Sequence, residues 1–488
     1  MFRDLHRTNA VSETNFGHLK QWAEIPGPTA LPIIGQMYHF LPGGELDNAF
    51  SVEFGKHLYQ KYGPIVRFNA FLGRSPFIVL FDPESVSMIL RSENVMPIRP
   101  GFQTLTFYRK SKNKNNQPMG LIADIGEPWR QFRSVVSPVL LQPKIIKLYH
   151  GKLDEVAMDM VARLRHLRGE DGMIQSPFDT EMNLWALESA SLVALGRRLN
   201  CFDLHLPADS TERKLIYLVH EIFRVADELD FRPSLWRYFP TRAFKKAMKL
   251  YEEQENTARY FIDRTMEELK ANGGSQTEYE KGVLEKLLDV NKEMAVIMAS
   301  DMITAGVDTT SNTMAATIYL LAINQQKQDI LREEVMSSDG KKTYLKACIK
   351  ESMRMMPVSA ANARETSKEY NVLGYRIPKG IQVTFMHQVM SQMEKYYPRA
   401  HEFIPERWIV GKDDPLYYGH AHPFTYNPFG YGVRSCVGRR IAILELETFL
   451  TRIIQNFKVE WLGPPGIVVK SSTLNYIRGP FNFVFKDI

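Results

Sequence analysis

Cysteine is scarce in this sequence. Among the 488 residues there are three cysteines, Cys201, Cys348 and Cys436. An odd and low number argues against a disulfide framework and indicates a reducing compartment. Cys201 and Cys348 each lie among apolar or helix-forming neighbours, so we interpret both as structural residues.

The beginning of the chain lacks a long apolar run. Residues 1–24 carry charged side chains throughout. None of their apolar stretches approaches the roughly 18 residues of a membrane span or forms the apolar core of a secretory signal. Arg3 and Arg7 suit a short mitochondrial presequence, whereas Asp4 and Glu13 weigh against one. We therefore expect residues 1–24 to be an N-terminal tail or a short mitochondrial presequence.

Linkers, repeats and acidic tails are absent as well, so nothing divides the chain after residue 24. A net charge of +6 is too diffuse to indicate nucleic-acid binding, and no nucleic-acid motif appears. Long stretches of helical pattern are accompanied by few and short strand patterns, such as residues 65–68 and 77–81. The sequence predicts one large domain over residues 25–488, mainly α with a small β region.

The last cysteine lies in a glycine-rich segment, residues 429–440, which reads FGYGVRSCVGRR. A helix without a breaker is predicted directly after it, so backbone amides and the positive end of the helix dipole favour a thiolate at Cys436. Gly438 lets the backbone approach a flat ligand. A thiolate held in this way can be the axial ligand of a haem iron. The alternative is an ordinary buried cysteine, since free cysteine is among the most buried residue types.

A tryptophan and an arginine stand four residues apart in the helix predicted after residue 126. Trp129 and Arg133 therefore share one helix face and can bind a carboxylate together. The alternative is a buried tryptophan that anchors the core beside a surface arginine.

A polar motif lies inside the long helix that the sequence predicts over residues 293–325. Residues 305–311 read AGVDTTS. The Thr309 hydroxyl can bond to the carbonyl of Ala305, four residues earlier, and bend the helix. A groove there could hold dioxygen, with Thr309 as a donor and Asp308 as a proton relay. The alternative is a helix kink with a polar patch.

These segments together resemble the cytochrome P-450 family, and the resemblance extends from Pro26 to the end of the chain. It implies a single fold in which haem b lies between the helix predicted over residues 293–325 and the loop of Cys436, the thiolate ligand of the iron. It assigns proton and oxygen handling to Asp308 and Thr309. The other side chains that it assigns to haem binding, chiefly at the propionates, are Trp129, Arg133, Arg364, Arg434 and Gly438.

The same resemblance gives a structural role to three charged residues. Glu351 and Arg354 stand three residues apart and can pair, although an isolated surface pair of this kind contributes little to stability. In the family such a pair is buried and is joined by an arginine from a later loop, here Arg407. We expect these three residues to form a charge lock that fixes the cysteine loop and takes no chemical step.

Basic residues cluster near the cysteine loop and in a preceding helix. Lys346 and Lys350 share a helix face, and Arg439 and Arg440 follow Cys436 closely. They form either a solvated surface or a docking site for an acidic electron donor. The pattern resembles the mitochondrial branch of the family, most closely its arthropod members, which take electrons from a small acidic ferredoxin of the adrenodoxin type and its NADPH-dependent reductase. The family usually carries a longer insert before the position of Lys346.

We therefore expect a haem-thiolate monooxygenase that inserts one oxygen atom of O2 into an apolar substrate. By analogy the substrate is steroid-like, such as an ecdysteroid, or a xenobiotic. The expected location is the matrix side of the mitochondrial inner membrane, with peripheral membrane contact, and the endoplasmic reticulum is the alternative. Three other functions stay open: a microsomal-type monooxygenase served by a flavoprotein reductase, a non-catalytic haem-binding protein, and an isomerase-like member that needs no external electrons, against which the presence of Thr309 weighs.

Overall fold

The structure is a computed structural model of the chain. It describes residues 19–488 apart from residues 32–33, 48–52, 71–74, 114–118, 204, 208, 233, 272–276, 278–279, 465, 467 and 472–473. Residues 1–18, which make up most of the expected tail or presequence, lie outside the described residues.

Helices make up most of the described chain. They are α1 (Glu53–Tyr62), α2 (Pro83–Arg91), α3 (Gln103–Lys112), α4 (Gly126–Leu140), α5 (Pro143–Lys147), α6 (His150–Leu167), α7 (Phe178–Ala194), α8 (Thr211–Ala226), α9 (Arg242–Ala271), α10 (Val283–Val290), α11 (Lys292–Ile323), α12 (Gln325–Met336), α13 (Thr343–Met355), α14 (His387–Met390) and α15 (Arg439–Asn456). A short π-helical turn, Asp227–Phe231, continues α8.

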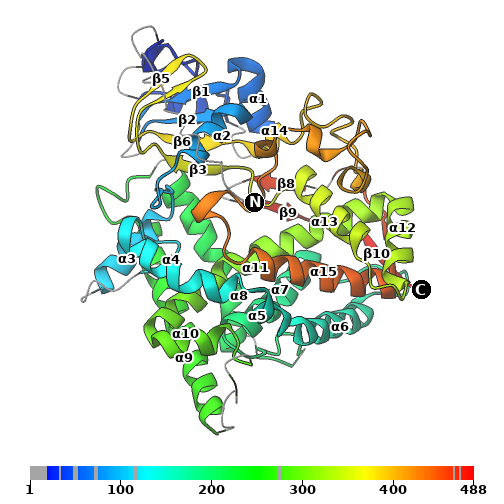
Figure 1. Cartoon of the computed structure of the whole chain (residues 1–488). Helices are drawn as coiled ribbons and strands as arrows, with labels where there is room; N and C mark the ends of the chain where they lie inside the picture. The colour runs from blue at the N-terminus through cyan, green and yellow to red at the C-terminus, as the bar shows by residue number, and fades with distance from the viewer. Residues whose placement is uncertain are drawn as a thin grey trace, which may run out of the picture.

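Short strands form the rest of the regular structure. They are β1 (Ile65–Phe68), β2 (Phe77–Leu80), β3 (Asn362–Glu365), β4 (Tyr370–Val372), β5 (Tyr375–Ile377), β6 (Gln382–Phe385), β7 (Phe457–Trp461), β8 (Val468–Ser471), β9 (Asn475–Arg478) and β10 (Phe483–Asp487). The main sheet has the order β1-β2-β6-β3, and its β2–β6 pair is parallel, while its two outer pairs are antiparallel. Figure 1 shows this sheet at one end of the molecule and the helical body below it. The predicted fold class, mainly α with a small β region, is confirmed.

Local sequence explains where several elements begin. The Asp82 side chain accepts a hydrogen bond of 2.8 Å from the Ser85 amide, and Pro83 occupies the first turn of α2, as is favourable at a helix start. Asn291 caps α11 in the same way, through the amide of Met294. The long predicted helix ends at Ile323, and a new helix, α12, starts two residues later.

The central helix α11 is apolar on nearly every side, so it is buried over most of its length. It packs against α7, which is equally apolar. Trp185 of α7 and Phe449 of α15 stack with ring centroids 4.4 Å apart in the same core. Among the described residues, no helix has the length and apolar content needed to span a membrane.

The connection between α12 and α13 is short, since only residues 337–342 lie between the two helices. Its ends are held by Glu334 near the end of α12, whose carboxylate accepts hydrogen bonds from the amides of Tyr344 (2.7 Å) and Leu345 (2.8 Å). A carboxylate at this position satisfies two of the free amides of a helix N-terminus. The short connection therefore closes without leaving the start of α13 unsatisfied.

Candidate functional site

The cysteine loop has a defined backbone geometry in front of α15. The Cys436 amide donates to the carbonyl of Phe429 at 2.8 Å, and the Ser435 amide donates to that of Gly432 at 3.1 Å. Gly430 and Gly432 have φ of +71° and +68°, a left-handed conformation that favours glycine. The next helix begins at residue 439, so Cys436 lies just ahead of its N-terminus, as the sequence predicts.

The Cys436 side chain is accessible although it lies deep in the protein. Its surface is exposed, yet burial raises the pKa of its thiol, so we infer that the exposed surface faces an internal space. The Gly438 amide and the charges of Arg133 and Arg99 lower the thiol pKa, but burial outweighs them. The local features that the sequence predicts to favour a thiolate therefore do so, and burial opposes them. A metal cation bound at the sulfur would supply the missing stabilisation, because metal binding deprotonates a coordinating thiol.

Part of α11 is accessible in the middle of an otherwise buried helix. Ala305 is exposed, and Gly306 and Thr309 are half-buried, while most of their neighbours are fully buried. The Thr309 hydroxyl donates to the carbonyl of Ala305 at 2.6 Å, which confirms the hydrogen bond expected from their spacing. The motif does not break the helix, since α11 runs without interruption through it.

Asp308 lies on another side of α11 and has no accessible surface. Its carboxylate accepts a hydrogen bond of 3.0 Å from the Tyr476 hydroxyl of β9, and its other oxygen lies 3.1 Å from Nε2 of His220 in α8. Asp308 is therefore sealed from direct contact with solvent, and its predicted role as a proton relay stays a prediction. Any proton must reach it through a neighbouring side chain.

Four guanidinium groups gather around the cysteine loop, from Arg99, Arg133, Arg364 and Arg434. Burial lowers the pKa values of all four, and repulsion between the guanidinium groups lowers those of Arg99, Arg133 and Arg434 further, that of Arg434 to about 9. All except Arg99 come from sequence-predicted positions, and Arg99 stands between two prolines just before α3. Charged side chains that are buried together in this way require a compensating anion.

Carbonyl groups hold three of these arginines in place. Arg434 donates to the carbonyls of residues 97, 121 and 124, at 2.9, 3.4 and 3.1 Å. Arg133 donates to the Ser435 carbonyl at 2.9 Å. Arg364 donates to the Tyr431 carbonyl at 3.1 Å. These contacts join the segment before α4, α4 itself and β3 to the cysteine loop.

Trp129 is almost fully buried, and the guanidinium of Arg434 covers its ring at 3.7 Å from the centroid. This is a cation–π contact in a buried setting. The predicted pairing of Trp129 with Arg133 as one carboxylate clamp therefore takes a broader form, in which the tryptophan also supports a second arginine.

The charge balance of this cluster fits an anionic ligand. The acidic groups that act on the four arginines include Glu93, which lies 2.6 Å from Arg364, and Asp124. The negative charge of Asp301 also raises the pKa of Arg99, but the Asp301 carboxylate already pairs with Arg109 at 2.7 Å. Positive charge thus remains in excess, beside a cysteine that faces an internal space. A flat metal-containing group with carboxylates at one edge, as haem is, suits this donor set.

Comparison with known proteins agrees with this geometry. The family profile described as Cytochrome P450 matches residues 25–473. The chain belongs to the cytochrome P450 family. Members of this family are oxidoreductases that bind haem iron through a cysteine thiolate and act as monooxygenases, so the resemblance found in the sequence is confirmed.

Insect proteins are among the relatives of this P450. It is 35% identical to "Cytochrome P450 CYP12A2" of Musca domestica, over 96% of this chain and 92% of that protein. It is also 35% identical to "Probable cytochrome P450 12a5, mitochondrial" of Drosophila melanogaster, over 96% and 91%. The identity to "Cytochrome P450 12b1, mitochondrial" of Drosophila acanthoptera is 31%, over 95% and 89%.

The three residues of the expected charge lock are paired and fully buried in this P450. Glu351 accepts from Arg354 at 2.8 and 2.9 Å and from Arg407 at 3.0 Å, and all three side chains are inaccessible. The Trp408 indole donates to the same carboxylate at 3.0 Å. The arginines also donate to carbonyls of the segment before the cysteine loop, including that of Pro398 at 2.6 Å. The pairing that the sequence predicts is confirmed.

The four basic residues predicted to dock a ferredoxin are exposed, and we call them the basic face: Lys346, Lys350, Arg439 and Arg440. They come from α13 and α15, which pack against each other. Figure 1 shows both helices beside the segment that carries Cys436. The Lys346 ammonium lies 4.0 Å from the carboxylate of Glu447, the one ion pair that this face makes with described residues, so most of its positive charge stays available to a partner.

Sequence reasoning missed Arg99, His220 and Tyr476 as site residues. Arg99 left a weak signal, an arginine placed between prolines ahead of a helix. His220 and Tyr476 left none, because each looks like an ordinary member of an amphipathic helix or a strand. Their contact with Asp308 exists only after α8, α11 and β9 have packed together.

Proposed function

We propose that this P450 is a mitochondrial monooxygenase that takes electrons from a small acidic ferredoxin, of the adrenodoxin type, itself reduced by an NADPH-dependent reductase. One oxygen atom of O2 enters an apolar substrate, and the other leaves as water with electrons from the ferredoxin and protons conducted by the chain. The observation that carries the proposal is the basic face directly behind the Cys436 loop. Two relatives at 35% and 31% identity whose names include the word mitochondrial support the location.

Haem b is held in this proposal by Cys436 at the iron and by the arginine cluster at the propionates. Carbonyl groups anchor Arg133, Arg364 and Arg434. They use only some of the five N–H groups of each guanidinium, so others can bind a carboxylate. Gly438 leaves room beside the cysteine, since a Cβ there would lie 3.9 Å from its sulfur. Bound haem supplies the iron at which dioxygen is activated.

Thr309 and Asp308 control protons on the opposite side of this space. The Thr309 hydroxyl, on the accessible side of α11, can turn from the Ala305 carbonyl and donate to a ligand in the internal space. Asp308 holds its charge away from solvent between Tyr476 and His220. A buried carboxylate next to a hydroxyl donor suits proton delivery, which general acid–base catalysis requires close to the reacting atoms.

An apolar substrate agrees with the aromatic side chains near α3 and α8. Phe102 makes edge-to-face contacts with Phe223 and Phe231, at 6.2 and 5.5 Å between ring centroids. Aromatic and apolar walls suit a steroid-like or xenobiotic compound and supply few polar contacts to select one. The finer choice between these classes rests on analogy alone.

Peripheral membrane contact has a candidate surface between α8 and α9. Leu235, Tyr238 and Phe239 are exposed there, and Phe107 of α3 is exposed beside them. Arg237 stacks on Trp236 in the same segment. Exposed aromatic and apolar side chains with adjacent positive charge bind the surface of an anionic bilayer.

The first test is spectroscopic. Purified, reduced protein with carbon monoxide should show the Soret band of thiolate-ligated haem, and Cys436→Ser should abolish that band. Product formation is then measured with an acidic ferredoxin or with a flavoprotein reductase as electron donor. Turnover with the flavoprotein alone would overturn the ferredoxin assignment, and haem binding without turnover in either system would support a non-catalytic protein.

The second test addresses the basic face. A Lys346→Glu/Lys350→Glu variant should lower the apparent affinity for the ferredoxin roughly tenfold or more and flatten its dependence on salt, because steering depends on charge. Lys270→Glu, on the exposed end of α9, is the control and should leave the affinity unchanged. Equal affinities of the double variant and the control protein would refute docking at this face.

A further inference from the structure

The Asp308 carboxylate is contacted by two titratable side chains from elements far apart in the sequence. Tyr476 Oη donates to Oδ2 at 3.0 Å, and His220 Nε2 lies 3.1 Å from Oδ1. The imidazole N–H is not aligned with Oδ1 as placed, since Oδ1 has no partner with full hydrogen-bond geometry among the described residues. Nε2 of His220 lies within hydrogen-bond distance of that oxygen, and no other described group donates a hydrogen bond to it.

His220 differs from Asp308 in its access to water. About 38% of the surface of the His220 side chain is accessible, whereas Asp308 has none. The imidazole therefore lies between accessible space and a sealed carboxylate. The charged groups that act on it from the packed elements are Asp308 of α11, Asp179 of α7 and Arg478 of β9.

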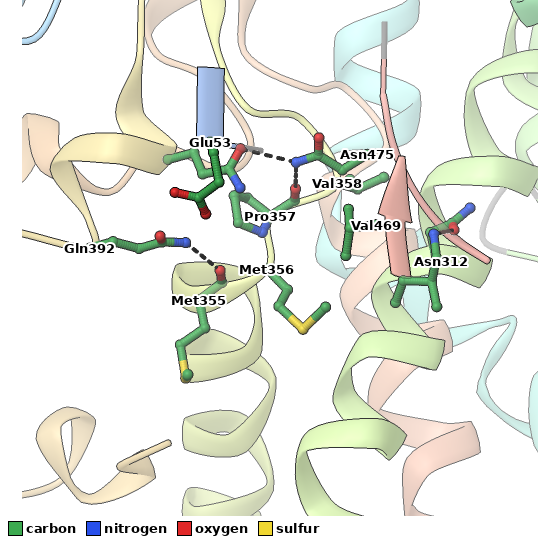
Figure 2. Close-up of a pocket in the computed structure, with 11 residues that line it drawn as sticks. Glu53, Asn312, Met355, Met356, Pro357, Val358, Gln392, Val469 and Asn475 are labelled. Carbon is green, nitrogen blue, oxygen red and sulfur yellow. Dashed lines mark hydrogen bonds between the residues drawn. The ribbon is translucent and has the colours of Figure 1, made fainter. Parts of the chain in front are cut away.

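The neighbouring pocket does not offer another approach. It has a volume of about 140 Å³ and is lined by Asn475 and Ile477 of β9 and by Asn312 of α11, among others. Figure 2 shows Asn475 donating to the carbonyl of Pro357 on this side of the strand. Side chains alternate along a strand, so Tyr476 points to the opposite face, toward Asp308. The pocket and the carboxylate are thus separated by β9.

The surroundings of Nε2 accommodate both protonation states of the imidazole. Asn183 of α7 places its amide nitrogen 3.1 Å from the same Nε2. A protonated Nε2 can donate to Asp308, and a deprotonated Nε2 can accept from Asn183 instead. Because Nε2 has an acceptor when it is protonated and a donor when it is not, it can lose its proton without leaving a buried lone pair unsatisfied.

We propose that His220 supplies protons to Asp308 and so acts on the monooxygenase reaction through that carboxylate, without touching the substrate itself. This inference rests on the proposed function. One proton passes from Nε2 of the imidazolium to Oδ1 of Asp308, which leaves a neutral imidazole and a neutral carboxylic acid. The neutral imidazole then takes up one proton at Nε2 from hydronium or a buffer acid, which restores the imidazolium and leaves water or the conjugate base. Tyr476 keeps its own proton, because burial and the Asp308 charge raise its pKa, and it holds Oδ2 so that Oδ1 is the receiving atom.

The first experiment compares His220→Gln with His166→Gln, a change at an exposed histidine of α6. Glutamine can still donate a hydrogen bond but cannot titrate. The coupling of product to NADPH should fall roughly tenfold to a hundredfold in His220→Gln, with more peroxide released, and should be unchanged in His166→Gln. Coupling in the unaltered protein should decline as pH rises through the His220 pKa, and this decline should vanish in His220→Gln.

The second experiment does not depend on turnover. Hydrogen–deuterium exchange at the imidazole C2 position, read by mass spectrometry of the haem-loaded protein, gives the midpoint of titration for each histidine. Asp308 raises the pKa of His220, so the His220 midpoint should fall in Asp308→Asn while the His166 midpoint stays constant. An unchanged His220 midpoint would overturn the link between the two residues.

The outcomes separate the two proposals. A protein that shows the thiolate band but makes no product with a ferredoxin refutes the proposed function, and the exchange experiment still tests the His220–Asp308 link. Normal coupling with an unaltered pH profile in His220→Gln overturns the role of His220 while the proposed function stands. If His220→Gln fails to retain haem, the His220 midpoints of the unaltered protein and of Asp308→Asn decide whether the two residues are linked.

Discussion

Replacing Glu351 by glutamine tests the charge lock most directly. The Glu351 carboxylate accepts five hydrogen bonds: two from Arg354, and one each from Arg407, Trp408 and the amide of Ile404. Glutamine keeps the size of the side chain but removes its charge and replaces one acceptor oxygen by an NH2 donor. That donor would face guanidinium N–H groups, and two buried arginines would lose their counter-ion.

The magnitude follows from the burial of the pair. Breaking a fully buried ion pair by removing one partner costs about 3–5 kcal/mol, because the remaining charge stays desolvated. Unfolding entropy of roughly 2.1 cal/mol/K per residue gives about 1 kcal/mol/K for 488 residues. The midpoint of thermal unfolding should therefore fall by about 3–5 °C.

The assay is thermal unfolding followed by circular dichroism at one fixed scan rate, since large proteins often unfold irreversibly. The haem content of each preparation is measured in parallel and should also fall, because the lock holds the segment that leads to Cys436. Glu402→Gln is the matched control. Its carboxylate pairs with Arg399 on the surface, where both side chains are more than half exposed, so the midpoint should not change.

A Glu351→Gln protein with the midpoint and haem content of the unaltered protein would refute this reasoning. It would mean that the two arginines find compensation elsewhere, for example in the carbonyls that they already contact. A loss of haem with an unchanged midpoint would show that the lock serves haem uptake and adds nothing to stability.

Three further changes have defined outcomes. Burial raises the pKa of Glu445 to about 8, so the folded protein keeps a proton that the unfolded chain releases above pH 4.5, and the free energy of unfolding declines as pH rises from 4.5 to 8. Glu445→Gln should therefore be more stable than the unaltered protein by about 3 kcal/mol at pH 7 and equally stable near pH 4.5. Unfolding measured at both pH values tests this. Gly432→Ala should lower stability by about 1–2 kcal/mol in the same assay, because φ there is +68° while a Cβ would meet nothing closer than 3.6 Å. Arg99→Gln should speed haem transfer to an acceptor protein about tenfold or more, whereas Arg91→Gln, at an exposed position, should not.

Features that depend on neighbouring residues could be predicted from the sequence. The cap of α2 by Asp82, the hydrogen bond from Thr309 to Ala305 and the pairing of Glu351 with Arg354 each join residues within four positions of one another. Such contacts follow from helix geometry alone. The position of Cys436 ahead of a helix followed in the same way from glycines and an uninterrupted helical pattern.

Only the tertiary structure decided which distant groups meet and how deeply they are buried. Tyr476 stands 168 positions from Asp308, and their contact exists because β9 packs against α11. Burial also opposes the local features that favour a thiolate, since it raises the pKa of Cys436 more than nearby positive charges lower it. Desolvation depends on every surrounding atom, whichever part of the chain supplies it, so a local sequence pattern cannot determine it.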